Sequence, residues 1–162
     1  MHKKILLRSE VDVNLTWDLS AIFKDLNSYN ETLGLIIPKA KALNEKFKGK
    51  INSAESINSC INELKEVSQL MVLVGTYSSL SVSVDQGNGE NLQRMMNFRS
   101  VSAQVGSLLS FIENEISFNS EENIEKAIEL SPDNAYFLQD ILRFKSHLLH
   151  PEVEKTLAAQ IG

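Results

Sequence analysis

Apolar residues recur every three or four positions over most of the chain, the spacing of a helix that buries one face. Between residues 28 and 48 the apolar positions are Tyr29, Leu33, Ile36, Ala40, Leu43 and Phe47. This stripe predicts a first helix, and Gly49 should end it because glycine accepts the left-handed conformation of a helix C-cap. Pro38 lies inside the stripe and is expected to kink or split the helix, since proline removes a backbone donor.

Two longer stripes follow and predict an antiparallel helix hairpin over residues 54–84 and 89–116. The first carries Ile57, Ile61, Leu64, Val67, Met71, Val74 and Tyr77, and the second Leu92, Met95, Met96, Phe98, Val101, Val105, Leu108, Leu109, Ile112 and Ile116. Ser53 is a suitable N-cap for the first helix, and residues 85–89, Asp-Gln-Gly-Asn-Gly, have the composition of a tight turn. Alternation at Leu80, Val82 and Val84 also fits a strand, but the helical phase upstream favours a helix face of small serines. If Leu64 and Leu108 are buried, replacing either with alanine should cost about 2–5 kcal/mol.

Shorter helices should complete the fold. Ser120 is expected to cap one that carries Ile124, Ala127, Ile128 and Leu130, and Ser131-Pro132 should end it. Another should carry Tyr136, Leu138, Ile141, Leu142 and Phe144, and a last one, starting at Pro151, should carry Val153, Leu157 and Ile161. The predicted fold is all-α, a helical bundle dominated by the long antiparallel hairpin, with an extended segment over residues 1–14 and a helical domain over 15–162. Because the last apolar stripe still runs at Gly162, we expect the chain to be truncated from something longer.

Composition narrows the classes of function. The chain has 162 residues, of which 43% are hydrophobic, and can bury a core. A net charge of −5 argues against a nucleic-acid or anionic-membrane surface, which needs clustered Lys and Arg. The longest uninterrupted apolar run, residues 70–75, is far shorter than the roughly 20 residues of a bilayer span, so no membrane partner is expected. A single cysteine provides no disulfide framework, which favours a cytoplasmic location.

Candidate chemistry is sparse. His147 and His150 lie three apart, with Glu152 and Glu154 after them and His2 far away, whereas the helical zinc-protease signature needs histidines at i and i+4. We interpret both histidines as loop residues near a helix start.

The other chemistry-bearing residues favour structural roles. Cys60 has no histidine near it and is interpreted as a small apolar residue, and the pair Met95 and Met96 as core packing. The Gly87-Asn88-Gly89 segment lacks the preceding strand and third glycine of a phosphate-binding loop. The carboxylates of a solvated helix face are Glu113, Glu115, Glu121, Glu122 and Glu125. The residues by themselves therefore predict neither a catalytic site nor a metal site.

Five segments then follow a recognisable order. Residues 16–23 are Thr-Trp-Asp-Leu-Ser-Ala-Ile-Phe, residues 47–50 are Phe-Lys-Gly-Lys, and residues 77–80 are Tyr-Ser-Ser-Leu with Asp85 downstream. Residues 136–149 are Tyr-Phe-Leu-Gln-Asp-Ile-Leu-Arg-Phe-Lys-Ser-His-Leu-Leu, and residues 152–157 are Glu-Val-Glu-Lys-Thr-Leu. In this order and spacing, from about Val13 to Gln160, the chain resembles oligoendopeptidase F, a branch of the thimet-oligopeptidase-like zinc metallopeptidases. Ser146 stands where that pattern has proline, and His150-Pro151 where it has a Ser/Thr cap.

The resemblance implies the N-terminal, non-catalytic part of a larger helical peptidase, forming one wall of a channel for short peptides. The family's H-E-x-x-H motif, in which two histidines hold Zn²⁺ and the glutamate activates water, does not occur in this chain. We therefore expect no catalytic residue and no metal ligand here, zinc only in the full-length parent, and a missing C-terminal catalytic domain as partner. His147 matches a histidine of the family and is interpreted as structural. Substrate-contacting residues are not assigned.

Two alternatives remain open at this point. One is a stand-alone helical interaction module that has lost the protease, and the other is a generic helical-bundle adaptor unrelated to peptidases. An in-frame H-E-x-x-H motif beyond Gly162 favours the peptidase, whereas a genuine stop codon favours the module.

Overall fold

A computed structural model describes residues 10–145 and divides them into two compact units. The long-helix unit comprises residues 10–46 and 63–109, and the short-helix unit comprises residues 47–62 and 110–145. Across this part of the chain every regular element is helical, which confirms the all-α prediction. The last predicted helix, with Pro151, Val153, Leu157 and Ile161, lies outside the described residues. The same is true of most of the predicted extended segment, whose described end contains the 3-10 turn η2, Val13–Leu15.

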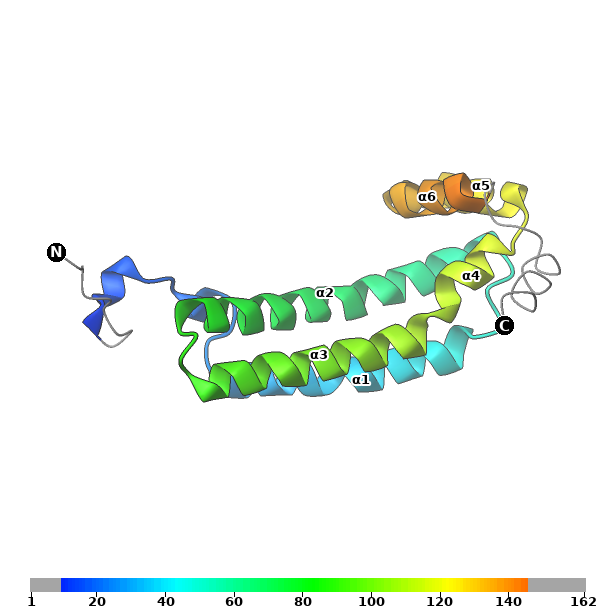
Figure 1. Ribbon diagram of the computed structural model, residues 1–162. Helices are drawn as coiled ribbons and strands as arrows, with labels where there is room; N and C mark the ends of the chain where they lie inside the picture. Colours follow the sequence, from blue (N-terminus) through cyan, green and yellow to red (C-terminus); the bar gives the residue numbers. More distant parts are fainter. Residues whose placement is uncertain (1–9, 146–162) are drawn as a thin grey trace, which may run out of the picture. The chain divides into compact units, whose positions relative to one another are not determined.

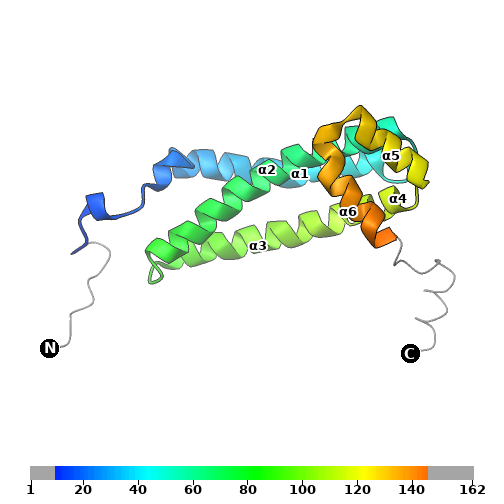
Figure 2. The ribbon, with the colours of Figure 1, turned by 90° about the horizontal axis from the view of Figure 1, so that it is seen from above.

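Three long helices form the long-helix unit and run beside one another (Figures 1 and 2). They are α1, Leu26–Phe47; the larger part of α2, Ala54–Val84; and α3, Gly89–Leu109. The short turn between α2 and α3 makes them antiparallel, so the predicted hairpin is confirmed. The 3-10 turn η3, Leu19–Ala21, precedes α1, and Asp18 caps it by accepting the backbone N–H of Ser20.

Helix α1 follows its predicted stripe. Asp25 Oδ1 accepts the N–H of Ser28 at 2.8 Å, which satisfies an amide that the helix cannot pair at its start. The stripe residues are buried, apart from the half-buried Leu33. The helix continues through the exposed Pro38, so the predicted split is wrong. Ile36 and Ala40, both fully buried, anchor the turns on either side of the proline, and this packing offsets the lost hydrogen bond.

An aromatic cluster closes one end of the long-helix unit. The Tyr29 ring lies 5.6 Å from that of Phe23 and 5.1 Å from that of Tyr77, centroid to centroid. The guanidinium of Arg94 lies over both tyrosine rings, at 5.7 and 5.8 Å. The Ser78 hydroxyl donates to the Val74 carbonyl at 2.8 Å, so the Tyr29 hydroxyl donates to Ser78 Oγ at 2.9 Å. Burial raises the pKa of Tyr29, although the Ser78 bond and the Arg94 charge oppose the shift.

The second half of α2 is helical to Val84, so the strand alternative at residues 80–84 is wrong. Ser78 and Ser81 are buried there, as expected of a helix face that lets neighbours approach closely. By length and composition α2 could also cross a membrane, with an 18-residue window of mean hydropathy 1.4, a test that core helices pass as well. This stretch was not apparent as an apolar run because serine, threonine and glutamine interrupt it.

The predicted helix over residues 89–116 is wrong in extent. Helix α3 ends at Leu109, and a separate α4, Phe111–Ser117, starts after Ser110. The break coincides with the boundary between the two units, because Val105 is buried in one of them and Ile112 and Ile116 in the other. Leu64 and Leu108 are half-buried rather than buried, and Met96 is 63% exposed, so its predicted core role is wrong.

The short-helix unit combines the first turns of α2 with α4, α5 (Glu121–Leu130), the 3-10 turn η4 (Pro132–Asn134) and α6 (Ala135–Lys145). Helix α6 packs on α4 and α5. The core residues of this unit are Phe47, Ile51, Ala54, Ile57, Cys60, Ile61, Ile112, Ile116, Ile124, Ala127, Leu138 and Ile141. Gly49, with φ of +76°, ends α1 as predicted, and the Ser120 hydroxyl caps α5 by accepting the N–H of Asn123.

Asparagine amides tie the segments of this unit together. Asn58 Nδ2 donates to the Ala127 carbonyl at 2.8 Å, and Asn134 Nδ2 donates to Asn58 Oδ1 at 2.7 Å. Asn119 Nδ2 donates to the carbonyls of Ile51 at 2.8 Å and Glu115 at 2.9 Å. Each bond except the last joins residues far apart in sequence, so these amides fix the loops that connect the short helices.

Candidate functional site

A groove lies between α4 and α6 in the short-helix unit. It has a volume of about 290 Å³ and is lined by Glu113, Asn114, Ser117, Phe137, Asp140, Ile141 and Phe144. Both walls are single helix faces. On α6, positions 137, 140, 141 and 144 recur with helical spacing, so one face of that helix supplies most of the lining.

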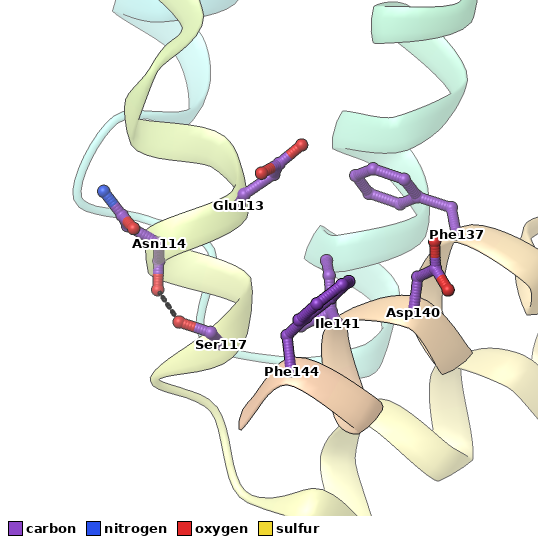
Figure 3. A pocket seen from close by; sticks show the side chains of 7 residues that line it. All are labelled: Glu113, Asn114, Ser117, Phe137, Asp140, Ile141 and Phe144. Atoms are coloured by element: carbon purple, nitrogen blue, oxygen red, sulfur yellow. Dashed lines mark hydrogen bonds between the residues drawn. The ribbon is translucent and has the colours of Figure 1, made fainter. Parts of the chain in front are cut away.

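The apolar side chains of the groove come from α6. Figure 3 shows Phe137 and Phe144 projecting toward the space between the helices, with Ile141 between them. Ile141 is only 8% exposed and belongs to the core, whereas Phe144 is 58% exposed. The buried Ile141 thus lies between the exposed Phe144 and the half-buried Phe137.

The polar side chains place negative charge at the groove. The exposed Glu113 carboxylate extends from α4 into the space opposite Phe137 (Figure 3), and no cation among residues 10–145 lies within ion-pair distance of it. Asp140 Oδ1 accepts from Arg143 at 2.7 Å, and the Arg143 guanidinium lies 5.1 Å from the Phe144 ring centre. The Ser117 hydroxyl donates to the Asn114 carbonyl at 2.7 Å.

This arrangement suits binding rather than catalysis. Among residues 10–145, the side chains that line the groove include no histidine, cysteine or lysine, and the Ser117 hydroxyl is engaged with a backbone carbonyl. Nucleophilic catalysis requires a nucleophile within hydrogen-bond reach of a base, and the described lining residues do not form that pair. Within residues 10–145, no three His, Cys, Asp or Glu side chains come together to hold a metal ion.

The residues that the sequence singled out are scattered. Cys60 is fully buried in the short-helix unit, out of reach of any substrate. Residues 87 and 88 form part of the turn before α3, and Gly89 is the first residue of that helix. His2, His147, His150, Glu152 and Glu154 lie outside the described residues, so their interpretation stays a prediction.

The predicted solvated carboxylates differ from one another. Glu121, Glu122 and Glu125 are exposed on α5, with the first two in its first turn. Glu115 is half-buried and accepts the Gly49 N–H at 2.7 Å, so it fixes the loop after α1. Glu113 lines the groove. The sequence did not predict that site, because the residues of its two walls are 20 or more positions apart and only α6 carries a recognisable spacing.

The segments that carried the resemblance have different structural roles. Trp17 is 75% exposed in the long-helix unit, and Asp18 caps η3, where the Ser20 hydrogen bonds lower its pKa. Tyr77 belongs to the aromatic cluster. Tyr136, at the start of α6, is 82% exposed, and the following turns of that helix provide the groove wall.

Comparison with known proteins places these features in context. No family model matches the chain. A Borreliella burgdorferi protein named oligoendopeptidase F homolog is 27% identical over 154 residues, which is 93% of this chain and 26% of the relative. Two Lactococcus lactis proteins, the plasmid-encoded oligoendopeptidase F of subspecies cremoris and an oligoendopeptidase F homolog of subspecies lactis, are each 26% identical over 156 residues. The chain thus spans about a quarter of the length of the curated relatives it matches.

A solved structure has the same fold. The crystal structure of a candidate peptidase from Chlamydophila abortus superposes with a TM-score of 0.80 at 19% identity, covering 97% of this chain and 27% of the other. The all-helical arrangement is therefore found within a larger protein. Along almost its whole length, this chain is similar to a part of the proteins named oligoendopeptidase F.

Proposed function

We propose that this chain is the N-terminal, non-catalytic segment of a zinc metallo-oligopeptidase that hydrolyses short peptides, and that it forms one wall of the substrate channel. The observation that carries the proposal is the alignment of 93% of the chain with an oligoendopeptidase F homolog. The shared fold with a candidate peptidase supports it independently of sequence identity.

The chemistry of the described residues is consistent with a supporting role. They offer no three-ligand metal set, so zinc does not fit this part of the chain, and we derive no catalytic step from it. What they offer is a rigid helical surface with an apolar groove suited to holding part of a peptide. Hydrolysis would then depend on residues from the rest of the parent protein.

The reading frame beyond Gly162 provides the direct test. We expect it to contain an H-E-x-x-H motif and the longer protein to cleave a quenched fluorescent peptide. A chelator should abolish turnover, and so should replacing the glutamate of that motif with glutamine, because both remove the activated water. The glutamine variant should keep its fold by circular dichroism.

Two results would overturn the proposal. One is a frame without the motif, and the other is a longer protein that contains the motif but does not cleave peptides with zinc present. A stop codon directly after Gly162 would instead support the helical interaction module. The expected cytoplasmic location can be tested in the same work by fractionating cells that express the full frame.

A further inference from the structure

We propose that the α4–α6 groove binds a peptide side chain that is aromatic or large and aliphatic, flanked by Lys or Arg. This assignment rests on the proposed peptide function and adds to it a preference for basic–aromatic segments. The juxtaposition that carries it is an apolar floor of Phe137, Ile141 and Phe144 with the Glu113 and Asp140 carboxylates at the same groove.

The size of the groove limits what can enter. A volume of about 290 Å³ lies at the lower end of small-molecule sites, so the groove accepts one or two side chains rather than a whole ligand. The floor is rigid because Ile141 and the neighbouring Leu138 are buried in the core. An incoming ring can therefore pack against Phe137 and Phe144 without reorganising the helix, in edge or offset geometry.

Charge decides which residues should flank that side chain. Glu113 has no ionic partner among residues 10–145, whereas Asp140 shares its charge with Arg143. Acidic residues also outnumber basic ones over the described part of the short-helix unit. A Lys or Arg beside the anchored ring would gain the Glu113 carboxylate as a partner, while an acidic residue would be repelled.

Fluorescence anisotropy of labelled peptides on the 162-residue chain tests this proposal. The probes are fluorescein-labelled Gly-Lys-Phe-Lys-Gly-Gly, a version with Ala for Phe, and a version with Glu for both Lys. The first should bind saturably, the alanine version about tenfold more weakly because it loses the apolar contact, and the glutamate version weakest of all. Binding of the first peptide should also weaken as salt is raised.

Variants locate the site. Glu113→Gln should weaken binding of the basic–aromatic peptide about two- to fivefold, the range expected for an exposed ion pair. Phe144→Ala should weaken it further and should still fold, since Phe144 is 58% exposed. The matched control is Glu129→Gln, which removes the same charge from an exposed position on α5 that does not line the groove.

The proposal is overturned if the basic–aromatic peptide does not bind, if the glutamate peptide binds equally well, or if Glu129→Gln weakens binding as much as Glu113→Gln. These outcomes are distinguishable from failure of the proposed function. A parent protein that cleaves peptides with chelator sensitivity keeps that function even if this groove binds nothing.

Discussion

The two units of this chain reach stability by different means. In the long-helix unit, three long helices bury a continuous stripe, and an aromatic cluster under Arg94 closes one end. In the short-helix unit, three of the helices have 7 to 11 residues, and amides of Asn58, Asn119 and Asn134 bond to groups far along the chain. The groove lies in the second unit.

The difference shows how helix length determines which interactions are needed. A long amphipathic helix holds its own backbone hydrogen bonds and needs neighbours only along one stripe. Short helices leave a larger share of backbone groups at their ends, and buried ends require polar partners. Side-chain amides meet this need because each offers both donors and an acceptor.

The largest expected effect is in the core of the short-helix unit. Leu138→Ala should lower the free energy of unfolding by about 2–5 kcal/mol, because Leu138 is fully buried and the change leaves a cavity. Leu64→Ala in the long-helix unit should lower the free energy of unfolding by only about 1–2 kcal/mol, because Leu64 is half-buried. Urea unfolding monitored by circular dichroism measures the free energy of unfolding of both variants. Equal losses would contradict the difference in burial between Leu138 and Leu64.

Loss of the hydrogen bonds made by asparagine side chains should have the next largest effect on stability. Asn119→Ala leaves the carbonyls of Ile51 and Glu115 without their side-chain donor and should cost about 1–3 kcal/mol. The matched control is Asn97→Ala on the long-helix unit, where the exposed Asn97 side chain accepts a hydrogen bond from Gln93. Its cost should stay below about 0.5 kcal/mol. If Asn97→Ala proved as damaging as Asn119→Ala, the distinction between the units would fail.

The aromatic cluster should respond to loss of its cation. Arg94→Met should lower the free energy of unfolding by about 0.5–2 kcal/mol. Methionine keeps the packing but not the charge over the Tyr29 and Tyr77 rings. It should also raise the pKa of Tyr29 further, since the Arg94 charge lowers it. A near-ultraviolet titration of tyrosine ionisation measures this shift.

The sign of the accompanying pH dependence follows from the direction of the Tyr29 shift. Because its folded pKa lies above the unfolded value near 10, Tyr29 contributes stability that is complete below about pH 10. That contribution is lost as pH rises through the folded pKa. A Tyr29→Phe variant should therefore lose less stability than the unmodified chain over the same alkaline range, and an identical alkaline loss in both would refute the assignment.

The smallest expected effects compare two glycines of the long-helix unit. Gly34→Ala should stabilise α1 by about 0.5–1 kcal/mol, since alanine favours helix and a Cβ there meets no atom within 4 Å. At Gly75 a Cβ would lie 2.6 Å from Phe98 Cζ, so the ring must move and the gain should shrink or reverse. Thermal unfolding of both variants checks the order, and a larger gain at Gly75 would contradict the close approach of α2 and α3.

Much of the fold could be predicted from the sequence because apolar spacing carries the information. The stripes and the caps at Ser53, Gly49 and Ser120 gave the starts or ends of α1, α2 and α5. The break at Ser110 could not be predicted, because Val105, Leu109, Ile112 and Ile116 keep helical spacing across it. That spacing does not reveal that the two halves of the stripe are buried in different units.

The groove could not be predicted from the sequence, because it too depends on how the helices pack. Glu113 appeared among solvated carboxylates, and residues 136–149 appeared as a segment of the resemblance that includes a predicted helix. Nothing local indicates that Glu113 and Phe137 face the same space, since that depends on how α6 packs on α4. Burial at Leu64 and Leu108 was overestimated for the same reason, because periodicity identifies a helix face but not how deeply each position is covered.

The most direct test of the account is peptide turnover by the 162-residue chain itself. Under the proposed function, this chain supplies a helical peptide-binding surface, and catalysis depends on residues of the longer parent protein. Purified chain with added Zn²⁺ is therefore expected to leave a quenched fluorescent peptide intact, whereas the proposed longer protein is expected to cleave it. Chelator-sensitive cleavage by the 162-residue chain alone would contradict the account.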